Sequence, residues 1–168
     1  MSHIVLIVTV GGVRYLADVG FGGMTLTAPL RLRAETEQST PHETFRLIGS
    51  DDEGWRLEVQ IGEDWRPVYA FEMNELTAED FQALNDKVSS GPTFRDHLLA
   101  ARPLKDRRLA LRDGRFRVYF ASGEPEERTI ASVPELREVL GNAFGIALPG
   151  TDRLDPALER ILGGAAAD

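Results

Sequence analysis

The sequence predicts an α+β protein in which a small antiparallel β-barrel or curled sheet is followed by a linker helix and an α/β domain. Two β-branched runs, residues 4–10 and 13–19, flank Gly11-Gly12, and both glycines can take the positive φ of a two-residue hairpin turn. A two-residue apolar period returns over residues 44–71, and a helical stripe begins after residue 77. The expected boundaries are a β-barrel domain over 1–75, a linker helix over 76–90 and an α/β domain over 91–168.

The Gly-Gly turn also predicts the register of the first hairpin, with Val10 opposite Val13 and Val5 opposite Asp18. Opposed residues share a face, and successive residues alternate between faces. We expect one face to point into the core, with Tyr15 as its only polar tip; it holds Ile4, Leu6, Val8, Val10, Val13, Tyr15, Ala17 and Val19. The other face holds His3, Val5, Ile7, Thr9, Arg14, Leu16 and Asp18.

His3 and Asp18 are therefore diagonal neighbours, and at a spacing of roughly 7–8 Å their side chains can meet. A carboxylate on an imidazole nitrogen fixes the tautomer and stabilises the imidazolium, as a general base requires. The alternative is a partly buried ion pair between strands, and the hairpin pattern alone leaves both interpretations open.

The remaining strands of the β domain follow from the period-two pattern. Breaks at residues 49–54 and 62–64 suit hairpin turns, so the domain is expected to hold about five antiparallel strands. Before them, Gly20, Gly22 and Gly23 form a loop where backbone can approach a ligand closely. The loop has the spacing of neither a Walker loop nor a dinucleotide fingerprint.

A capping-box-like start at residues 77–80 and the stripe Phe81, Leu84 and Val88 predict the linker helix, which ends in a hydroxyl-rich turn at 89–94. A meander over 107–113, 115–121 and 128–131 then turns at Asp113-Gly114. Ser132 is expected to cap a helix running to residue 140. A last short helix covers 155–162, and a disordered tail is expected over 163–168.

Composition excludes several classes of function. A net charge of -8 and a pI near 4.9 argue against nucleic-acid or anionic-membrane binding. With no cysteine, the 168-residue chain has no disulfide and no thiolate metal site. His42 and His97 lack ligand spacing, so no metal is expected. The apolar run 4–10 is too short for a signal sequence or a membrane span, which predicts a cytoplasmic protein.

One segment of this acidic chain is rich in basic residues. The simpler interpretation is a solvated face, and the alternative is contact with the phosphates of a ligand. These residues are Arg102, Lys105, Arg107, Arg108, Arg112, Arg115 and Arg117.

A histidine that opens an apolar strand, followed by a tyrosine-containing strand ending in Asp18-Val-Gly-Phe-Gly-Gly and then Pro29-Leu30, resembles the arylamine N-acetyltransferases. The resemblance continues through residues 65–71, 80–85, 89–102 and 144–146. It implies a Cys-His-Asp triad in which His3 and Asp18 are the second and third members. It also implies that Phe21 lines the acceptor pocket, with Gly22 beside it, and that the α/β domain is a lid over the cofactor.

In this family a thiolate takes acetyl from acetyl-CoA and passes it to an arylamine or hydrazine in a ping-pong cycle. The loop after the linker helix lies near the coenzyme A cleft in the family, which makes Ser89, Ser90 and Thr93 cofactor-binding candidates; a simple helix stop is the alternative. The loop is about two residues shorter here than in the usual pattern.

The chain departs from the family in having no cysteine. The resemblance places that cysteine on a helical domain before the histidine strand, so the chain is expected to correspond to the second and third domains of the enzyme. Little or no activity is then expected of the chain alone. It is a portion of such an enzyme, one half of a split enzyme whose partner supplies the cysteine, or a non-catalytic coenzyme A-binding or interaction module. An uncovered apolar face is expected to favour self-association or a cysteine-bearing partner.

Overall fold

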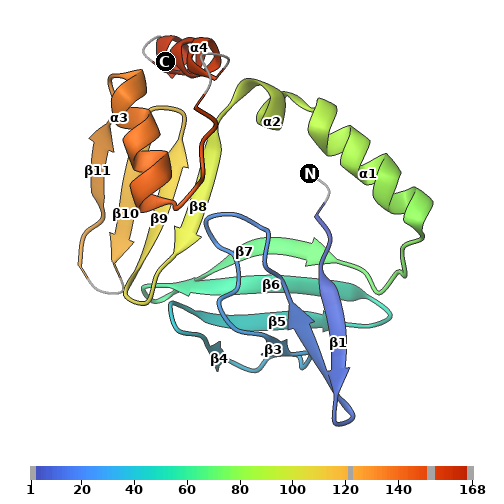
Figure 1. Cartoon of the computed structure of the whole chain (residues 1–168). Helices are drawn as coiled ribbons and strands as arrows, with labels where there is room; N and C mark the ends of the chain where they lie inside the picture. Colours follow the sequence, from blue (N-terminus) through green and yellow to red (C-terminus); the bar gives the residue numbers. More distant parts are fainter. Residues whose placement is uncertain (1–2, 121–122, 151–153, 166–168) are drawn as a thin grey trace. The chain divides into compact units, whose positions relative to one another are not determined.

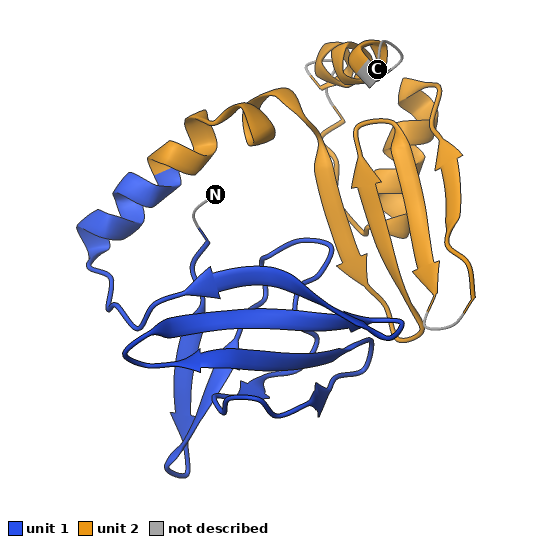
Figure 2. Ribbon diagram, turned by 180° about the vertical axis from the view of Figure 1, so that it is seen from behind, with its two compact units in different colours: residues 1–85 blue, residues 86–168 orange. Residues whose placement is uncertain are grey.

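The computed structural model describes residues 3–120, 123–150 and 154–165, and confirms the α+β class (Figure 1). Within those ranges the strands form three antiparallel sheets. The chain divides into two compact units, unit 1 (Met1–Asn85) and unit 2 (Asp86–Asp168), which Figure 2 colours separately.

Unit 1 is built from two of the sheets. The first has the order β1-β2-β3 and consists of β1 (Leu6–Val10), β2 (Val13–Ala17) and β3 (Leu30–Arg31). The second has the order β4-β5-β6-β7 and consists of β4 (Gln38–Ser39), β5 (Thr44–Ser50), β6 (Gly54–Ile61) and β7 (Asp64–Phe71). Every neighbouring pair is antiparallel.

The hairpin register is confirmed, because Val10 pairs with Val13 and Leu6 with Ala17 across the turn. Gly11 and Gly12 have φ of 57° and 78°, which the turn requires. The prediction of which face points inward was wrong. Leu16, on the face of His3 and Asp18, is fully buried, whereas Leu6 on the opposite face is 56% exposed.

The core of unit 1 explains this reversal. Leu16 packs in one cluster with Phe45, Leu47 and Leu57 of the second sheet, and Ile7 packs against that cluster. Alternation defines two faces, but here both carry apolar side chains, so only the partner sheet decides which face is buried. The catalytic candidates consequently lie on the core side of the hairpin.

A buried carboxylate stabilises the second sheet. Glu58 of β6 accepts from Arg46 at 2.8 Å and from Arg56 at 2.9 Å. Burial favours a higher pKa for Glu58, but the hydrogen bonds from the two guanidinium groups outweigh it and lower the pKa. Between β6 and β7 the register shifts at Leu57/Glu58: Leu57 pairs with Tyr69 and Glu58 with Pro67, which leaves Val68 as the extra residue of a bulge in β7.

The predicted linker helix is observed as α1 (Ala78–Ser90). Its start is a reciprocal capping box: the Asp80 amide donates to Thr77 Oγ1 at 3.2 Å, and the Thr77 amide donates to Asp80 Oδ2 at 2.9 Å. The short helix α2 (Pro92–Asp96) follows, with proline in its first turn.

Unit 2 packs helices on a four-stranded sheet of order β11-β10-β9-β8. Its strands are β8 (Leu99–Pro103), β9 (Arg107–Arg112), β10 (Arg115–Phe120) and β11 (Glu126–Thr129). The sequence pattern missed β8 as a strand. The helices are α3 (Val133–Glu138), the π-helix η1 (Val139–Ala143) and α4 (Asp155–Ala165).

The core of unit 2 is formed by Leu109, Leu111 and Phe116 of the sheet with Leu136 and Leu140 of the helices. Ser132 caps α3 as predicted, by accepting from the Glu135 amide. The prediction of a disordered tail was wrong for residues 163–165, which belong to α4. Residues 166–168 lie outside the described ranges. Across the described residues, no helix is both long and apolar enough to cross a membrane.

Candidate active site

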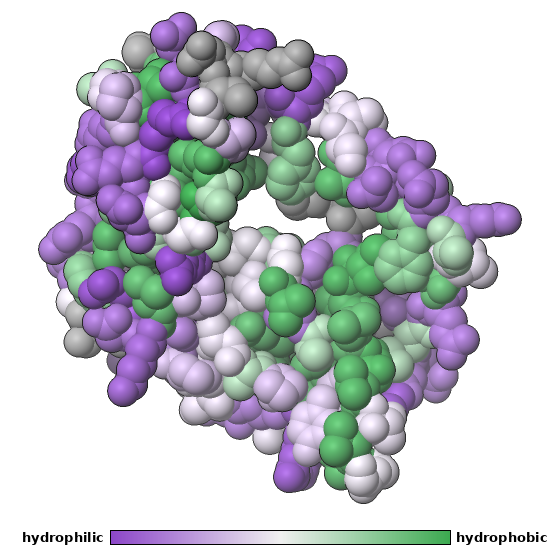
Figure 3. Space-filling model, viewed as in Figure 1, coloured by the Kyte–Doolittle hydropathy of each residue, from purple (hydrophilic) through white to green (hydrophobic). Residues whose placement is uncertain are grey.

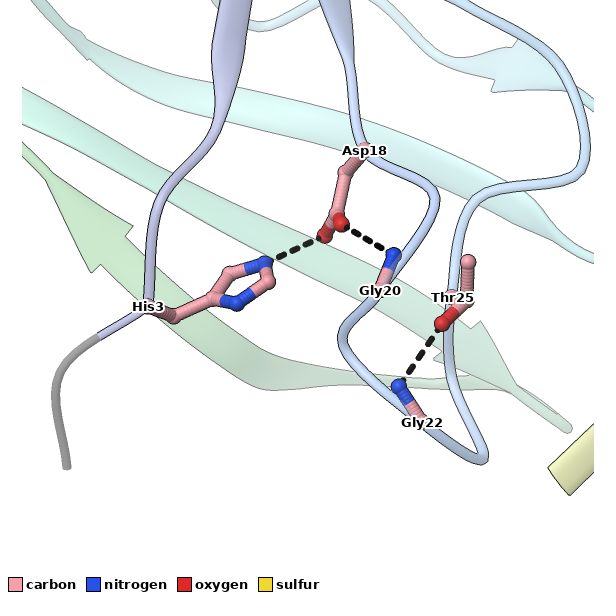
Figure 4. A network of polar contacts seen from close by, with 5 residues as sticks. All are labelled: His3, Asp18, Gly20, Gly22 and Thr25. Carbon is pink, nitrogen blue, oxygen red and sulfur yellow. Dashed lines mark hydrogen bonds and ion pairs between the residues drawn. The ribbon is translucent and has the colours of Figure 1, made fainter. Parts of the chain in front are cut away.

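The structure brings His3 and Asp18 together at the open end of the first hairpin. His3 Nε2 lies 2.9 Å from Asp18 Oδ2, and the other ring nitrogen points away from the carboxylate (Figure 4). The Asp18 side chain is 1% exposed and the His3 side chain 22%. Within the described residues, His3 Nδ1 has no hydrogen-bond partner. The pair therefore presents one anchored nitrogen and one available nitrogen.

The loop after β2 holds the carboxylate in place. Asp18 Oδ1 accepts from the Gly20 amide at 3.0 Å, so each carboxylate oxygen has its own donor. Further along, the Gly22 amide donates to Thr25 Oγ1 at 2.7 Å, and the Thr25 amide donates back to the Gly22 carbonyl at 3.1 Å. Gly22 has a φ of 103°, which a side chain would oppose.

Aromatic rings surround the histidine. The Phe21 ring meets the His3 ring edge-on at 5.1 Å between centroids, and the Tyr69 ring lies 5.3 Å from His3 and 4.9 Å from Phe21. Such contacts favour one ring orientation and keep water from part of the imidazole. Phe21, the residue expected to line an acceptor pocket, thus lies directly against the expected base.

Tyr69 is the site residue that sequence reasoning missed. Its hydroxyl is buried and makes no hydrogen bond of normal geometry, but it interacts electrostatically with the Asp18 carboxylate. Burial first, and Asp18 second, raise the pKa of the Tyr69 phenol. The period-two pattern of β7 indicated an inward residue at this position, but its approach to Asp18 depends on the packing of two sheets.

The three cofactor-binding candidates lie in unit 2, at the end of α1 and in α2. Ser90 Oγ donates to the Asp86 carbonyl of its own helix at 2.7 Å, which fits a helix end. Ser89 and Thr93 are exposed. Their role toward a cofactor stays a prediction.

The other two histidines have structural partners. His97 Nδ1 lies 2.9 Å from Asp113 Oδ2, and His42 Nδ1 lies 3.1 Å from Thr27 Oγ1. Among the residues that the structure describes, no group of three or more His, Asp or Glu side chains could hold a metal ion.

Much of the basic segment of unit 2 is paired, which favours the solvated-face interpretation. Arg115 and Arg117 both contact Glu127, and Arg107 contacts Asp106. Arg108 is buried, and Arg102 donates to the Ala143 carbonyl at 3.0 Å.

Comparisons of the sequence and of the structure with known proteins both find N-acetyltransferases. A family model described as N-acetyltransferase matches residues 1–153. The arylamine N-acetyltransferase / N-hydroxyarylamine O-acetyltransferase of Salmonella typhimurium is 37% identical over 150 residues, which are 88% of this chain and 53% of that protein. The arylamine N-acetyltransferase of Mycolicibacterium smegmatis is 38% identical over 151 residues, 88% of this chain and 54% of that protein.

Solved structures agree with the sequence relatives. The Salmonella typhimurium enzyme superposes with a TM-score of 0.84 at 32% identity, over 95% of this chain and 60% of that one. The Mycobacterium marinum arylamine N-acetyltransferase in complex with CoA superposes with a TM-score of 0.84 at 33% identity, over 94% and 60%. The chain spans about half the length of the curated relatives it matches.

Proposed function

The chain belongs to the arylamine N-acetyltransferase family, and from that premise we propose that its His3–Asp18 pair serves as the base of acetyl transfer from acetyl-CoA to an arylamine or hydrazine. The observation that supports the proposal is which ring nitrogen of His3 contacts Asp18. Asp18 holds Nε2 of the imidazole, which leaves Nδ1 as the nitrogen that can take a proton.

The chemistry requires a cysteine thiol opposite Nδ1. Nδ1 takes the thiol proton, and the thiolate attacks the thioester carbonyl of acetyl-CoA. Coenzyme A leaves as the thiol, with the proton that the imidazolium returns. The amine then attacks the acetyl-cysteine, its proton passes to Nδ1, and the cysteine leaves as a thiolate. Asp18 stabilises the imidazolium in both halves of the cycle.

Phe21 and Gly22 are proposed to meet the acceptor amine. Phe21 offers an aromatic face beside His3, which suits a flat aryl group. Gly22, at positive φ and with nothing within 4 Å of the position its Cβ would take, leaves room next to that ring.

The thiol must come from outside these 168 residues, because the sequence contains no cysteine. We propose that the chain is a portion of the enzyme and that a cysteine-bearing domain, on the same or another polypeptide, docks on the outer face of the hairpin. That face exposes Leu6 (56%), Val8 (42%) and Val10 (63%), and Figure 3 shows apolar side chains gathered over this hairpin. A patch of this kind on a monomer marks an interaction surface.

The test is complementation. The chain alone, the cysteine-bearing domain of a family member alone, and the two mixed or fused are assayed for coenzyme A release from acetyl-CoA plus an arylamine. We expect release only when both parts are present. Val10→Asp, which leaves the site intact, should weaken the mixed reaction more than the fused one. Equal inactivity of the mixture and the fusion would contradict the proposal.

A second candidate is a non-catalytic module that binds coenzyme A, which the absence of a cysteine favours. Calorimetry with coenzyme A separates the two. Binding by the chain alone, together with no gain of activity on complementation, supports the module, and no measurable binding removes its premise.

A further inference from the structure

Unit 2 contains a cavity of about 410 Å³ that the proposed chemistry does not use. Its volume falls in the range of roughly 300–1,000 Å³ that small-molecule sites occupy. All the residues that line it belong to unit 2, and they come from the sheet and from η1. The cavity is therefore a property of this unit alone.

Strand pairing explains how the cavity is built. Arg102 of β8 pairs with Leu109 of β9, Leu109 with Val118 of β10, and Val118 with Glu126 of β11. Directly paired residues share one face, so these four form a single row across the sheet, and all four line the cavity. The row has a cation at one end, a carboxylate at the other and an apolar floor between them.

The two ends lie about 14 Å apart, at three strand spacings of about 4.8 Å each. Arg102 is held in place because it donates to the Ala143 carbonyl, and Gly145 lies so close that a Cβ there would meet Arg102 Nη1 at 2.9 Å. Within the described ranges Arg102 has no carboxylate partner, and Glu126 has no cationic one. The charges at both ends are thus available to a ligand.

The roof of the cavity is the π-helix. The Phe144 amide bonds the Val139 carbonyl, which closes a turn wider than an α-helical one, and Asn142 and Ala143 of this turn line the cavity. A π turn costs stability compared with an α turn, and such turns are frequent at functional sites. Asn142 adds an exposed amide to the lining.

We propose that this cavity is a ligand site for a small monocarboxylate with a compact apolar body. The carboxylate binds Arg102, with Arg107 at the rim as a second cation, and the apolar body lies on Leu109 and Val118. A guanidinium with free N–H groups suits a carboxylate. Glu126 at the far end of the row repels a second negative charge, which disfavours dicarboxylates and polyphosphates.

The probe for the test is 2-naphthoate, titrated into the full chain and followed by calorimetry and ligand fluorescence. Arg102→Met should weaken binding about tenfold or more, because it removes a charge-assisted hydrogen bond. Arg112→Met, an exposed arginine on the other face of β9, is the matched control and should not change it. Naphthalene-2,6-dicarboxylate should bind more weakly than 2-naphthoate, and Glu126→Gln should narrow that difference.

The proposal is overturned if the parent chain does not bind 2-naphthoate, if Arg102→Met binds it as tightly as the parent, or if Arg112→Met weakens binding as much as Arg102→Met does. Val10→Ser tests whether the probe binds the apolar hairpin face of unit 1 instead, and lost binding in that variant also overturns it. If Arg102→Met does not fold, Glu126→Gln at the exposed sheet edge still gives the charge test. Asp18→Asn should leave probe binding unchanged, which keeps this outcome separate from that of the acetyl-transfer proposal.

Discussion

Each unit contains a histidine–aspartate pair, and the two pairs have similar contact distances. His3 lies 2.9 Å from Asp18, and His97 lies 2.9 Å from Asp113. In each pair the second carboxylate oxygen accepts from a backbone amide, that of Gly20 at 3.0 Å or of Leu98 at 2.9 Å. The pairing distance alone therefore does not distinguish a reactive pair from a structural one.

The surroundings do distinguish them. Asp18 binds Nε2 of its histidine, whereas Asp113 binds Nδ1. Aromatic rings cover His3, and its aspartate is 1% exposed against 16% for Asp113. Asp113 also sits at a φ of 54° in a hairpin turn, and its amide donates to the Leu98 carbonyl at 2.8 Å. The second pair ties a turn to the chain before β8, and the first leaves one ring nitrogen available for the proposed proton transfer.

The largest expected difference between the pairs is in acetyl transfer by the complemented protein. Asp18→Asn should lower the rate by about 10³-fold or more, because an amide in that place favours the wrong tautomer and cannot stabilise the imidazolium. Asp113→Asn should leave the rate unchanged. Coenzyme A release measures both, and similar rates for the two variants would remove the distinction.

The second effect is on stability, and here we expect the larger change from the second pair. Asp113→Ala should cost unit 2 about 1–3 kcal/mol, since the Leu98 amide loses its acceptor and alanine opposes the left-handed backbone. Asp113→Asn, which tolerates positive φ and keeps an acceptor oxygen, is the matched control. Hydrogen exchange of the β9 and β10 amides measures the loss unit by unit. Equal exchange in the alanine and asparagine variants would show that Asp113 does not stabilise the turn.

A smaller effect concerns Tyr69, which only the first pair has beside it. Because the pKa of Tyr69 is raised, its phenol stays protonated in the folded state where an unfolded tyrosine, with a pKa of about 10, ionises. The stability from this group is complete below pH 10 and is lost as the pH rises above it. Between pH 8 and 11 the parent should lose about 1.4 kcal/mol more than Tyr69→Phe. Denaturant titrations at both pH values measure the loss, and parallel losses would contradict the buried phenol.

The comparison also shows what the amino-acid pattern can predict. The Gly11-Gly12 turn determines the hairpin register, because a two-residue turn leaves no freedom, and register places His3 near Asp18. Which face of the hairpin is buried depends on Phe45 and Leu57 of a separate sheet, and no local pattern contains that information.

The same limit explains the residues that were missed. Tyr69 meets Asp18 through packing across two sheets, next to a bulge in β7 that alternation does not predict. His97 and Asp113 are brought together by β8, a strand that the pattern did not indicate, even though the Asp113-Gly114 turn was predicted. Local turn and capping signals were reliable, and long-range neighbours were not.

The last prediction concerns which ring nitrogen carries the proton in each histidine, and it needs no change in rate or stability. When neutral, His3 should carry its proton on Nε2 and His97 on Nδ1, since each donates to its carboxylate through the nitrogen that faces it. Nitrogen-15 NMR of the ring atoms distinguishes the two tautomers, with His3→Gln and His97→Gln for assignment. If His3 instead carried its proton on Nδ1, the nitrogen proposed to accept the thiol proton would be blocked, and Asp18 could not be the group that orients the base.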